Sequence, residues 1–477
     1  MVGRYVRTPI REESKEERDR GFGEVLEPFT QEEAVIEAQR CLQCAMPFCV
    51  QACPITQDCR GYIDLIAHRK FDEAAHLTVR DNPLATVLCK TCYHYCEEDC
   101  VMGERGNPIA IRHLKRAALE FGKADLPYVP SKSTLPERIA VVGGGPSGLM
   151  AAWELALRGY SVVVYEEHKF LGGQMDTIPK YHLQGYEQEK DLARFRNLGI
   201  RFEFGQKAGT DFTPEGLLQK GFAAVLLAVG AWDPRTLGIE GEHLPGVFYA
   251  LSFLLAMNTG DTGLLGRKGR KVLVIGGGDV AMDAARSSLR LSSEGNVALA
   301  YRRGEKEMPA GEEELRDAEI EGLQFLYNRA PVRILGTEQV EGVVLQRTEL
   351  GPPDGNGRRG VVTVAGSEET FPCDTVIIAA GERAEVKEMP KELGLKVTPH
   401  GWAEGAREDW MTDVPGVFAC GGRSVVYAMG AGTRAAGAID AYLSTRAGRP
   451  PTVRPDPLGA PSPAPLPSGY GGPSWRL

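Results

Sequence analysis

Short, mostly apolar runs alternate along much of the chain with stretches whose apolar residues recur at helical spacing. Residues 139–142 form such a run, and a helical stretch and a second apolar run at 161–165 follow it. The same order returns at 271–275, in a helix to about residue 291, and at 297–301. Apolar runs of this length, separated by helices, are typical of a parallel sheet that is buried on both faces. The pattern therefore predicts an α/β protein with two Rossmann-like units.

The first 130 residues show helix signals instead. Thr30 and Glu33 form a capping box ahead of an apolar stretch that ends near Ala38. Further helices are expected over residues 63–75 and 109–121. We expect these helices to bury little apolar core of their own.

Three further patterns concern the organisation of the chain. Two apolar strands that end in glycine, residues 224–230 and 375–381, are expected to return to a shared sheet and to flank the second unit as hinges. A hairpin is expected over residues 343–364, with a Gly/Pro-rich loop at 351–360. The predicted domains are a helical region at 1–130 with a proline-containing linker at 123–137, a first nucleotide domain at 131–266 and 376–448, a second at 267–375, and a disordered Pro-rich tail at 449–477.

Each Rossmann-like unit carries a glycine-rich loop between its first strand and its helix. Strand, G-x-G-x-x-G-type loop, helix and strand in this order bind dinucleotides, because glycines let the backbone approach a pyrophosphate at the N-terminus of the helix. The candidate contacts are Gly143, Gly145, Pro146, Ser147 and Gly148 in the first loop and Gly276, Gly278, Asp279, Val280 and Ala281 in the second.

The two units differ at the end of the second strand. In the first unit this strand ends at Glu166, whose carboxylate can accept hydrogen bonds from a ribose diol. In the second unit Arg302 and Arg303 follow the strand. Because arginine accommodates a 2′-phosphate, we expect the second unit to prefer NADPH.

Nine of the eleven cysteines lie between residues 41 and 100. Eight of them form two runs, C-x2-C-x4-C-x3-C-P and C-x2-C-x3-C-x3-C. Two C-x2-C pairs could frame a zinc site, but the wider gaps and the proline after the first run favour two 4Fe-4S clusters. Clusters would also hold the helical region together. The candidate ligands are Cys41, Cys44, Cys49, Cys53, Cys89, Cys92, Cys96 and Cys100, whereas Cys59 has no evident partner and is expected to be a free buried thiol.

Charge and hydropathy narrow the class of protein further. A net charge of −9 over 477 residues gives no reason to expect nucleic-acid binding. The first 30 residues contain no apolar signal-peptide core, and glycines interrupt the most apolar stretches. We therefore expect a soluble, cytoplasmic protein that does not interact with a membrane.

Together these motifs resemble the small (beta) subunits of bacterial NADPH-dependent glutamate synthases. The wider group includes the N-terminal half of dihydropyrimidine dehydrogenase and the large subunit of NADH-dependent ferredoxin:NADP oxidoreductase. The resemblance extends to about residue 447, and its most specific segments are 40–54, 81–83, 92–100, 108–111, 301–303 and 308–309.

The resemblance implies an adrenodoxin-reductase-like fold, in which an NADPH domain is inserted into an FAD domain and an α-helical double 4Fe-4S cluster domain precedes both. The first loop, with Glu166 and Gly173, would hold FAD, and the second would hold NADPH. Residues 416–422 resemble the closing motif of the FAD domain, with Gly421 and Gly422 as contacts. Relatives have Gly-Asp there, whereas this chain has Gly421-Gly422-Arg423, so only a backbone contact is expected at Gly422.

The resemblance also implies how the clusters are held. Cys41, Cys44, Cys49 and Cys100 would bind the first cluster, and Cys53, Cys92 and Cys96 the second. In relatives a Gln or Glu can complete the second site. The corresponding residue here is Lys115, which as a cation is a poor ligand, so Cys89 is expected to be the fourth ligand.

The predicted function is NADPH oxidation by a flavo-iron–sulfur subunit that passes electrons through FAD and the clusters to a partner. The cofactors carry the chemistry, so no catalytic acid–base residue is expected. The resemblance implies that the partner is the large catalytic subunit of glutamate synthase. An electron-input or bifurcating subunit for ferredoxin, a hydrogenase or a formate dehydrogenase is the alternative. A thiol–disulfide reductase is disfavoured, because Cys373 and Cys420 are single and residues 171–175 contain no cysteine.

Overall fold

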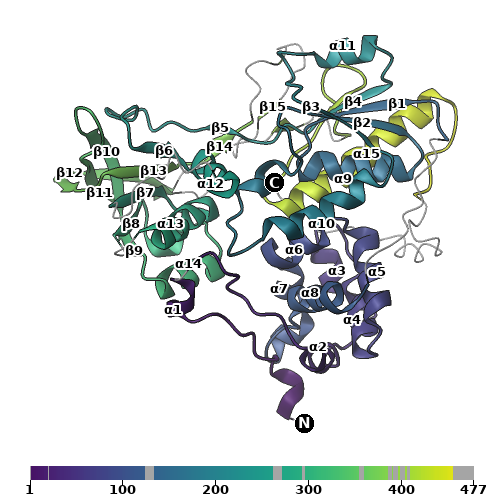
Figure 1. Cartoon of the computed structure of the whole chain (residues 1–477), viewed down its shortest axis with the longest axis horizontal. Helices are drawn as coiled ribbons and strands as arrows, with labels where there is room; N and C mark the ends of the chain where they lie inside the picture. The colour runs from purple at the N-terminus through teal and green to yellow at the C-terminus, as the bar shows by residue number, and fades with distance from the viewer. Residues whose placement is uncertain are drawn as a thin grey trace.

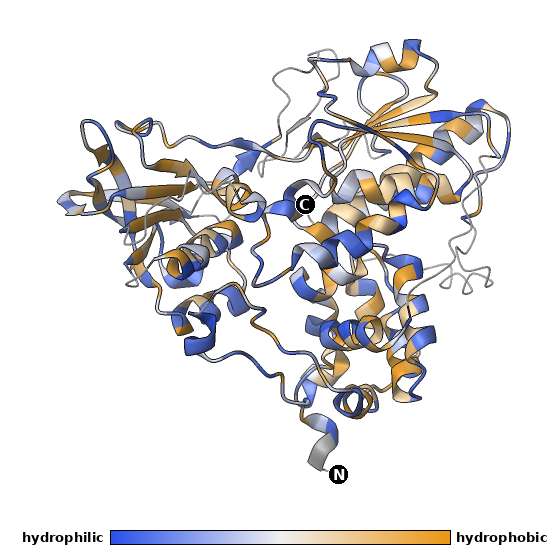
Figure 2. Cartoon of the chain, in the orientation of Figure 1, coloured by the Kyte–Doolittle hydropathy of each residue, from blue (hydrophilic) through white to orange (hydrophobic). Residues whose placement is uncertain are grey.

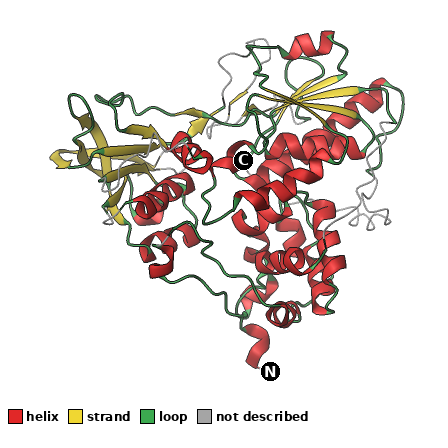
Figure 3. Cartoon of the chain, viewed as in Figure 1, coloured by secondary structure: helices red, strands yellow, loops and turns green. Residues whose placement is uncertain are grey.

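The computed structural model contains two five-stranded parallel sheets and a bundle of short helices. The second nucleotide unit lies at the left of Figure 1, the first at the upper right, and the helices α2 to α8 at the lower right; Figure 3 separates the strands from the helices. The residues that the structure describes are 2–19, 21–123, 134–260, 271–292, 296–353, 359–384, 389, 396–397, 403–404 and 409–454.

The first sheet has the strand order β17-β4-β1-β2-β3. Its side chains alternate between two buried faces, since Ile139 and Val141 pack into the core under α9 and α15, while Ala140 and Val142 join a smaller core on the other face. The strands are β1 (Arg138–Val142), β2 (Ser161–Glu166), β3 (Arg201–Phe204), β4 (Ala224–Leu227) and β17 (Val417–Ala419), and the helices are α9 (Pro146–Leu157), η3 (Gly173–Thr177), α10 (Gly185–Arg196), α11 (Pro214–Gln219) and α15 (Val425–Arg446).

The second sheet repeats this plan, with the order β6-β13-β7-β8-β9. Its strands are mostly apolar in Figure 2, as expected of strands covered on both faces. The elements are β6 (Val247–Tyr249), α12 (Ala250–Thr259), β7 (Val272–Gly276), α13 (Asp279–Leu291), β8 (Val297–Tyr301), η5 (Glu305–Glu307), α14 (Glu312–Ile320), β9 (Gln324–Tyr327) and β13 (Thr375–Ala379).

The prediction that the two glycine-ended strands share a sheet is wrong. β4 pairs with β1 and β17 in the first sheet, whereas β13 pairs with β6 and β7 in the second. Because the first sheet contains strands from both sides of the second unit, the predicted insertion is present. The predicted domain boundary at 266/267 lies outside the described residues, and the one at 375/376 falls within β13 of the second sheet.

The expected hairpin is present beside the second sheet. β11 (Gly342–Pro353) and β12 (Arg359–Phe371) pair antiparallel, and β10 (Arg329–Leu335) completes a three-stranded sheet. Residues 354–358 of the predicted loop lie outside the described residues, as do 124–133 of the predicted linker and 455–477 of the predicted tail. Two small antiparallel pairs join β5 (Asp233–Pro234) to β14 (Glu382–Arg383) and β15 (Lys396–Val397) to β16 (Ala403–Glu404).

The N-terminal region is helical, as predicted, but two expectations about it are wrong. The stretch expected as one helix is broken at Arg69, whose positive φ of 61° separates two helices. The bundle also has its own apolar core, which includes Val35, Ile66, Leu114 and Ala118. The elements are η1 (Val2–Tyr5), α1 (Lys15–Arg18), α2 (Gln31–Ala38), α3 (Phe48–Ala52), α4 (Cys59–Ala67), α5 (Phe71–Asp81), α6 (Ala85–Thr91), α7 (Tyr95–Glu98), η2 (Val101–Glu104) and α8 (Ile111–Phe121).

The capping box predicted at Thr30 and Glu33 is confirmed at the start of α2. Among the described residues, no helix has the length and apolar character needed to cross a bilayer.

Candidate functional site

The first glycine loop lies at the carboxyl end of β1. Gly143 has a φ of +109°, and a Cβ on it would overlap the carbonyl oxygen of Ala228 on the neighbouring strand. Glu166 is buried at the end of β2, where its carboxylate accepts N–H bonds from Gly144 (2.7 Å) and His168 (2.8 Å). A carboxylate oxygen has more than one lone pair, so Glu166 keeps acceptor capacity for a ribose hydroxyl.

A cavity of about 850 Å³ runs from this loop to the N-terminus of α13. The side chain of Ser424, on its wall, has a buried oxygen without a hydrogen-bond partner among the described residues. An elongated cavity with a glycine cradle and an unpaired hydroxyl fits a dinucleotide such as FAD. The predicted contacts that line it are Gly143, Gly145, Pro146, Ser147, Glu166, Gly173, Gly421, Gly422, Asp279 and Val280, whereas Gly148, Gly276, Gly278, Ala281, Arg302 and Arg303 do not.

The second glycine loop repeats the geometry of the first. Gly276 has a φ of +155°, and a Cβ on it would overlap the carbonyl oxygen of Ala379. A Cβ on Gly277 would lie 2.5 Å from the ring of Tyr301. The carboxylate of Asp279, at the start of α13, accepts the N–H of Gly311 (2.9 Å), and burial raises its pKa.

Arg302 and Arg303 lie at the end of β8, outside the large cavity. Arg302 is exposed, and Arg303 is half-buried with one Nη donating to the carbonyl of Arg359 (3.3 Å). The buried Nε of Arg303 has no hydrogen-bond partner within the described part of the chain. An unpaired guanidinium N–H at this strand end fits a 2′-phosphate.

The four predicted ligands of the first cluster line one cavity: Cys41, Cys44, Cys49 and Cys100. Apolar side chains, among them Ile63 and Met102, form much of its wall. Thiols gathered in an apolar cavity fit a 4Fe-4S cluster, and burial raises the pKa of the Cys41 thiol to about 11, so cluster binding must release protons.

The second predicted site lies between the bundle and the first sheet. Cys53, Cys92 and Cys96 interact electrostatically with one another, and Lys115 lies near Cys53. The Cys89 thiol donates to the carbonyl of Thr86 (3.0 Å), and burial raises its pKa to about 12 although the cations of Lys115, Lys90 and Arg116 act in the opposite direction. Cys89 therefore remains a predicted ligand.

Cys59 is a free, buried thiol, as expected. The thiols of Cys49 and Cys96, one from each predicted site, lie close to it. Spacing could not show this proximity, because Cys59 belongs to neither cysteine run.

Several side chains that the motifs did not indicate join the cluster bundle to the nucleotide units. Arg112 donates to the carbonyl of Cys92 (3.2 Å) and pairs with Glu313 on α14 (2.9 Å). Tyr95 packs against Tyr427 on α15, with ring centroids 5.3 Å apart. Arginines and tyrosines between motifs carry no sequence signal of their own, so only the fold brings them to the site.

Two family models match the chain. The model for pyridine nucleotide-disulphide oxidoreductases matches residues 137–439, and the model for domain II of dihydropyrimidine dehydrogenase, with its 4Fe-4S cluster, matches residues 18–125. The chain belongs to the pyridine nucleotide-disulphide oxidoreductase family. It is an NADPH-dependent oxidoreductase, and its cofactors are FAD, NADPH and 4Fe-4S clusters, which confirms the predicted fold class and cofactors.

Named relatives of this oxidoreductase carry out different reactions. The glutamate synthase (NADPH) small chain of Escherichia coli is 33% identical over 88% of this chain and 94% of its own length. The NADP(+)-dependent formate dehydrogenase subunit beta of Moorella thermoacetica is 34% identical over 83% of this chain and 60% of its own. Mycobacterium tuberculosis FprA in complex with NADPH has the same fold, with a TM-score of 0.56 and 22% identity over 66% of this chain and 86% of its own.

Proposed function

We propose that this chain is the electron-input subunit of a glutamate synthase, and that its partner is the large catalytic subunit. The observation that carries the proposal is that Cys92 lines the same cavity as the FAD-loop residues Gly143 and Gly145 and the closing-motif residue Gly421. A flavin bound in this cavity would therefore have Cys92 of the second cluster site on the wall beside it, as one-electron transfer out of the flavin requires. Bound FAD supplies the conversion of a hydride into single electrons, and the protein supplies position and insulation from water.

The protein groups divide this work. The glycines and Glu166 bind the first nucleotide, while Asp279, Val280, Arg302 and Arg303 orient the second. Cys41, Cys44, Cys49 and Cys100 hold the first cluster; Cys53, Cys92 and Cys96 hold the second, with Cys89 as its fourth ligand. For Cys89 to bind, its thiol must give up its hydrogen bond to Thr86. Cys89→Ser should lose or convert one cluster while FAD stays bound and reducible by NADPH, and unchanged iron content with both cluster signals intact would exclude Cys89 as a ligand.

The choice of partner rests on the relatives. The match covers 94% of the E. coli small chain but 60% of the Moorella formate dehydrogenase subunit, which supports a glutamate synthase over a formate dehydrogenase partner. The second candidate function is electron input to another acceptor, and it is favoured by similar relatives such as the NADPH-Fe(3+) oxidoreductase subunit beta of Geobacter sulfurreducens, 34% identical over 83% of this chain and 63% of its own. A cytoplasmic location is part of the same proposal.

The test is isolation of the native complex under anaerobic conditions. We expect a large glutamate synthase subunit to co-purify, and the complex to form glutamate from glutamine and 2-oxoglutarate with NADPH as reductant. The isolated chain should reduce an artificial acceptor with NADPH but form no glutamate. Co-purification with a different redox enzyme, together with intact NADPH oxidation, would replace the glutamate synthase proposal with the second candidate.

A further inference from the structure

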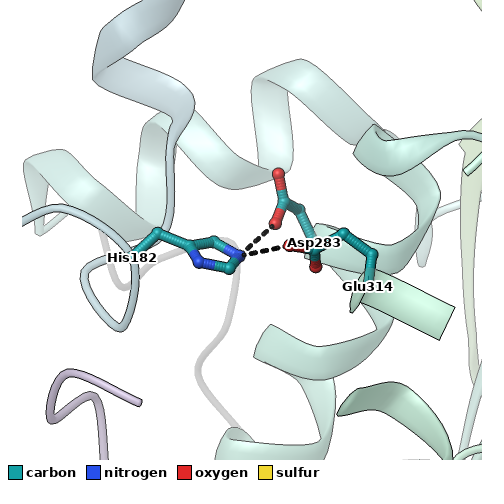
Figure 4. Close-up of side chains that lie close together, drawn as sticks. All are labelled: His182, Asp283 and Glu314. Carbon is teal, nitrogen blue, oxygen red and sulfur yellow. Dashed lines mark ion pairs between the residues drawn. The ribbon is translucent and has the colours of Figure 1, made fainter. Parts of the chain in front are cut away.

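A loop of the first nucleotide unit reaches into the second. His182 lies between η3 and α10 of the first unit, and its ring points at Asp283 on α13 and Glu314 on α14 (Figure 4). The Nε2 atom lies 3.5 Å from the Asp283 carboxylate and 3.2 Å from the Glu314 carboxylate. All three side chains line the cavity that joins the two nucleotide sites.

The preceding residue, Tyr181, strengthens the same contact. Its fully buried ring is covered by the guanidinium groups of Arg286 and Arg290 from α13, at 4.7 and 4.1 Å from the ring centroid. Its hydroxyl lies 3.3 Å from the Asp283 carboxylate. Cation–π contacts of this kind contribute about 0.5–2 kcal/mol each, more when they are desolvated.

Buried ion pairs extend the contact into the second unit. Arg286 is fully buried and binds Glu314 (2.6 Å), Asp317 (3.1 Å) and Glu321 (2.8 Å). Arg18 of the N-terminal segment lies 3.4 Å from Asp317. α1, which contains Arg18, lies beside α14 in Figure 1. The loop therefore contacts a network of buried ion pairs that connects the second unit to the N-terminal segment.

His182, Asp283 and Glu314 are also a donor set that could bind a metal ion. However, one Nη of Arg286 lies 3.5 Å from His182 Nε2 and 2.6 Å from Glu314. A metal cation would have to lie next to this guanidinium, and the two positive charges would repel each other. The carboxylates are already paired, so the geometry favours an ionic clamp over a metal site.

The charge on the imidazole follows from its surroundings. Burial alone would lower the pKa of His182, but the carboxylates of Glu314 and Asp283 outweigh it and raise the pKa to about 9. His182 is therefore positively charged at neutral pH and makes charge-assisted contacts to both helices of the second unit.

We propose that His182 is a positioning residue for the NADPH-to-FAD step, because its contacts to Asp283 and Glu314 clamp α13 against the first unit. Asp283 lies one helical turn after Asp279, at the end of α13 that faces the nucleotide cavity. The clamp therefore fixes the helix whose N-terminus carries the predicted NADPH contacts. Hydride transfer needs the donor carbon of the nicotinamide and the acceptor nitrogen of the flavin about 3–3.5 Å apart, and a shift of about 1 Å can cost a hundredfold in rate. The inference rests on the proposed function only in assuming that NADPH reduces the flavin.

The test compares His182→Gln, which removes the charge, with His182→Lys, which keeps it, in the full FAD- and cluster-loaded chain. His68→Gln is the matched control, because His68 is an exposed histidine at the C-terminal end of α4 and does not line the cavity. We expect His182→Gln to lower the limiting rate of flavin reduction by roughly tenfold or more while the dissociation constant for NADPH changes little. His182→Lys should restore most of the rate, and His68→Gln should match the wild type.

A second readout does not depend on activity. Hydrogen exchange of the backbone amides in residues 179–184 and at the start of α13 should be roughly ten- to a hundredfold faster in His182→Gln, as the loss of one charge-assisted contact predicts, and close to wild type in His182→Lys. The clamp is overturned if His182→Gln reduces its flavin at the wild-type rate and shows wild-type hydrogen exchange. It is also overturned if His182→Lys loses as much of the flavin-reduction rate as His182→Gln does. Slowing of the wild type by EDTA at unchanged iron content would show a metal site instead. If NADPH fails to reduce the wild-type flavin, the proposed function fails, whatever the exchange data show.

Discussion

The two glycine loops occupy the same place in two sheets that share the arrangement of four of their five strands. Each follows the central strand, β1 or β7, and its first glycine lies against the carbonyl at the end of the adjacent strand, that of Ala228 or Ala379. Both first glycines have a positive φ. The sheet geometry itself therefore requires glycine at this position, whichever nucleotide is bound.

The loops differ in what surrounds them. Gly148 packs so closely that a Cβ would overlap the carbonyl oxygen of Gly143, whereas the second loop has Ala281 at the equivalent place. The first strand pair ends at the buried Glu166, and the second at Tyr301, whose ring covers Gly277. The comparison teaches that the shared sheet fixes the loop, while the side chains at the strand ends select the ligand.

Exchanging the residue at the third glycine position of each loop, Gly148 or Ala281, should break the likeness most strongly. Gly148→Ala should abolish stable FAD binding, because the new methyl group must displace the loop backbone at Gly143. Ala281→Gly should leave NADPH affinity within about threefold, since it removes only one methyl group. Flavin content after gel filtration and NADPH titration measure the two effects. Full FAD occupancy in Gly148→Ala would show that the loop can shift, and that close packing does not distinguish the sites.

The second difference predicts how the chain selects NADPH. Replacing Arg302 and Arg303 together with alanine should raise the KM for NADPH more than tenfold and leave that for NADH nearly unchanged, because each charge-assisted bond to a phosphate contributes roughly 1.5–3 kcal/mol. Steady-state reduction of an artificial acceptor measures both constants. Lys306→Ala is the control, because Lys306 is an exposed basic residue in η5, which follows the two arginines. A wild type that uses NADH as well as NADPH would contradict the assignment.

Local sequence patterns predicted the structural features that depend on residues close together in the chain. The two strand–loop–helix–strand units, the capping box of α2 and the hairpin of β11 and β12 all follow from periodicity and turn residues. The break at Arg69 did not, because no glycine or proline marks it. The apolar runs of β4 and β13 look alike, so their different sheets could be assigned only from long-range pairing.

The site was predictable to a similar degree. The family resemblance indicated the four thiols that share a cavity, and the glycine motifs indicated most of the nucleotide cradle. The ionic clamp joins residues more than a hundred positions apart, and Cys59 lies close to two cysteines from different runs. Contacts of this kind depend on how whole elements pack, and a single sequence carries no periodic signal for them.

The smallest predicted effect concerns two buried carboxyl groups, one in each unit, whose pKa values are shifted in opposite directions. In the first unit, burial raises the pKa of Asp176 to about 7, and one of its oxygens has no hydrogen-bond partner among the described residues. In the second unit, burial would raise the pKa of Glu321, but Arg290 and Arg286 outweigh it and hold the pKa at about 2. The first carboxylate thus lacks the cationic partners that the second has.

These opposite shifts predict opposite pH dependence. A raised pKa in the folded state means that Asp176 costs stability increasingly as the pH rises from about 4 through 7, so the stability gained by Asp176→Asn should grow by about 1 kcal/mol between pH 6 and 8.5. The depressed pKa of Glu321 means that its contribution is complete above about pH 4.5 and is lost only toward pH 2. Glu321→Gln should therefore destabilise the protein equally at pH 6 and 8.5. Denaturant unfolding of both variants at the two pH values measures this, and an Asp176→Asn effect that does not change with pH would mean that the carboxyl group is solvated or paired in the loaded protein.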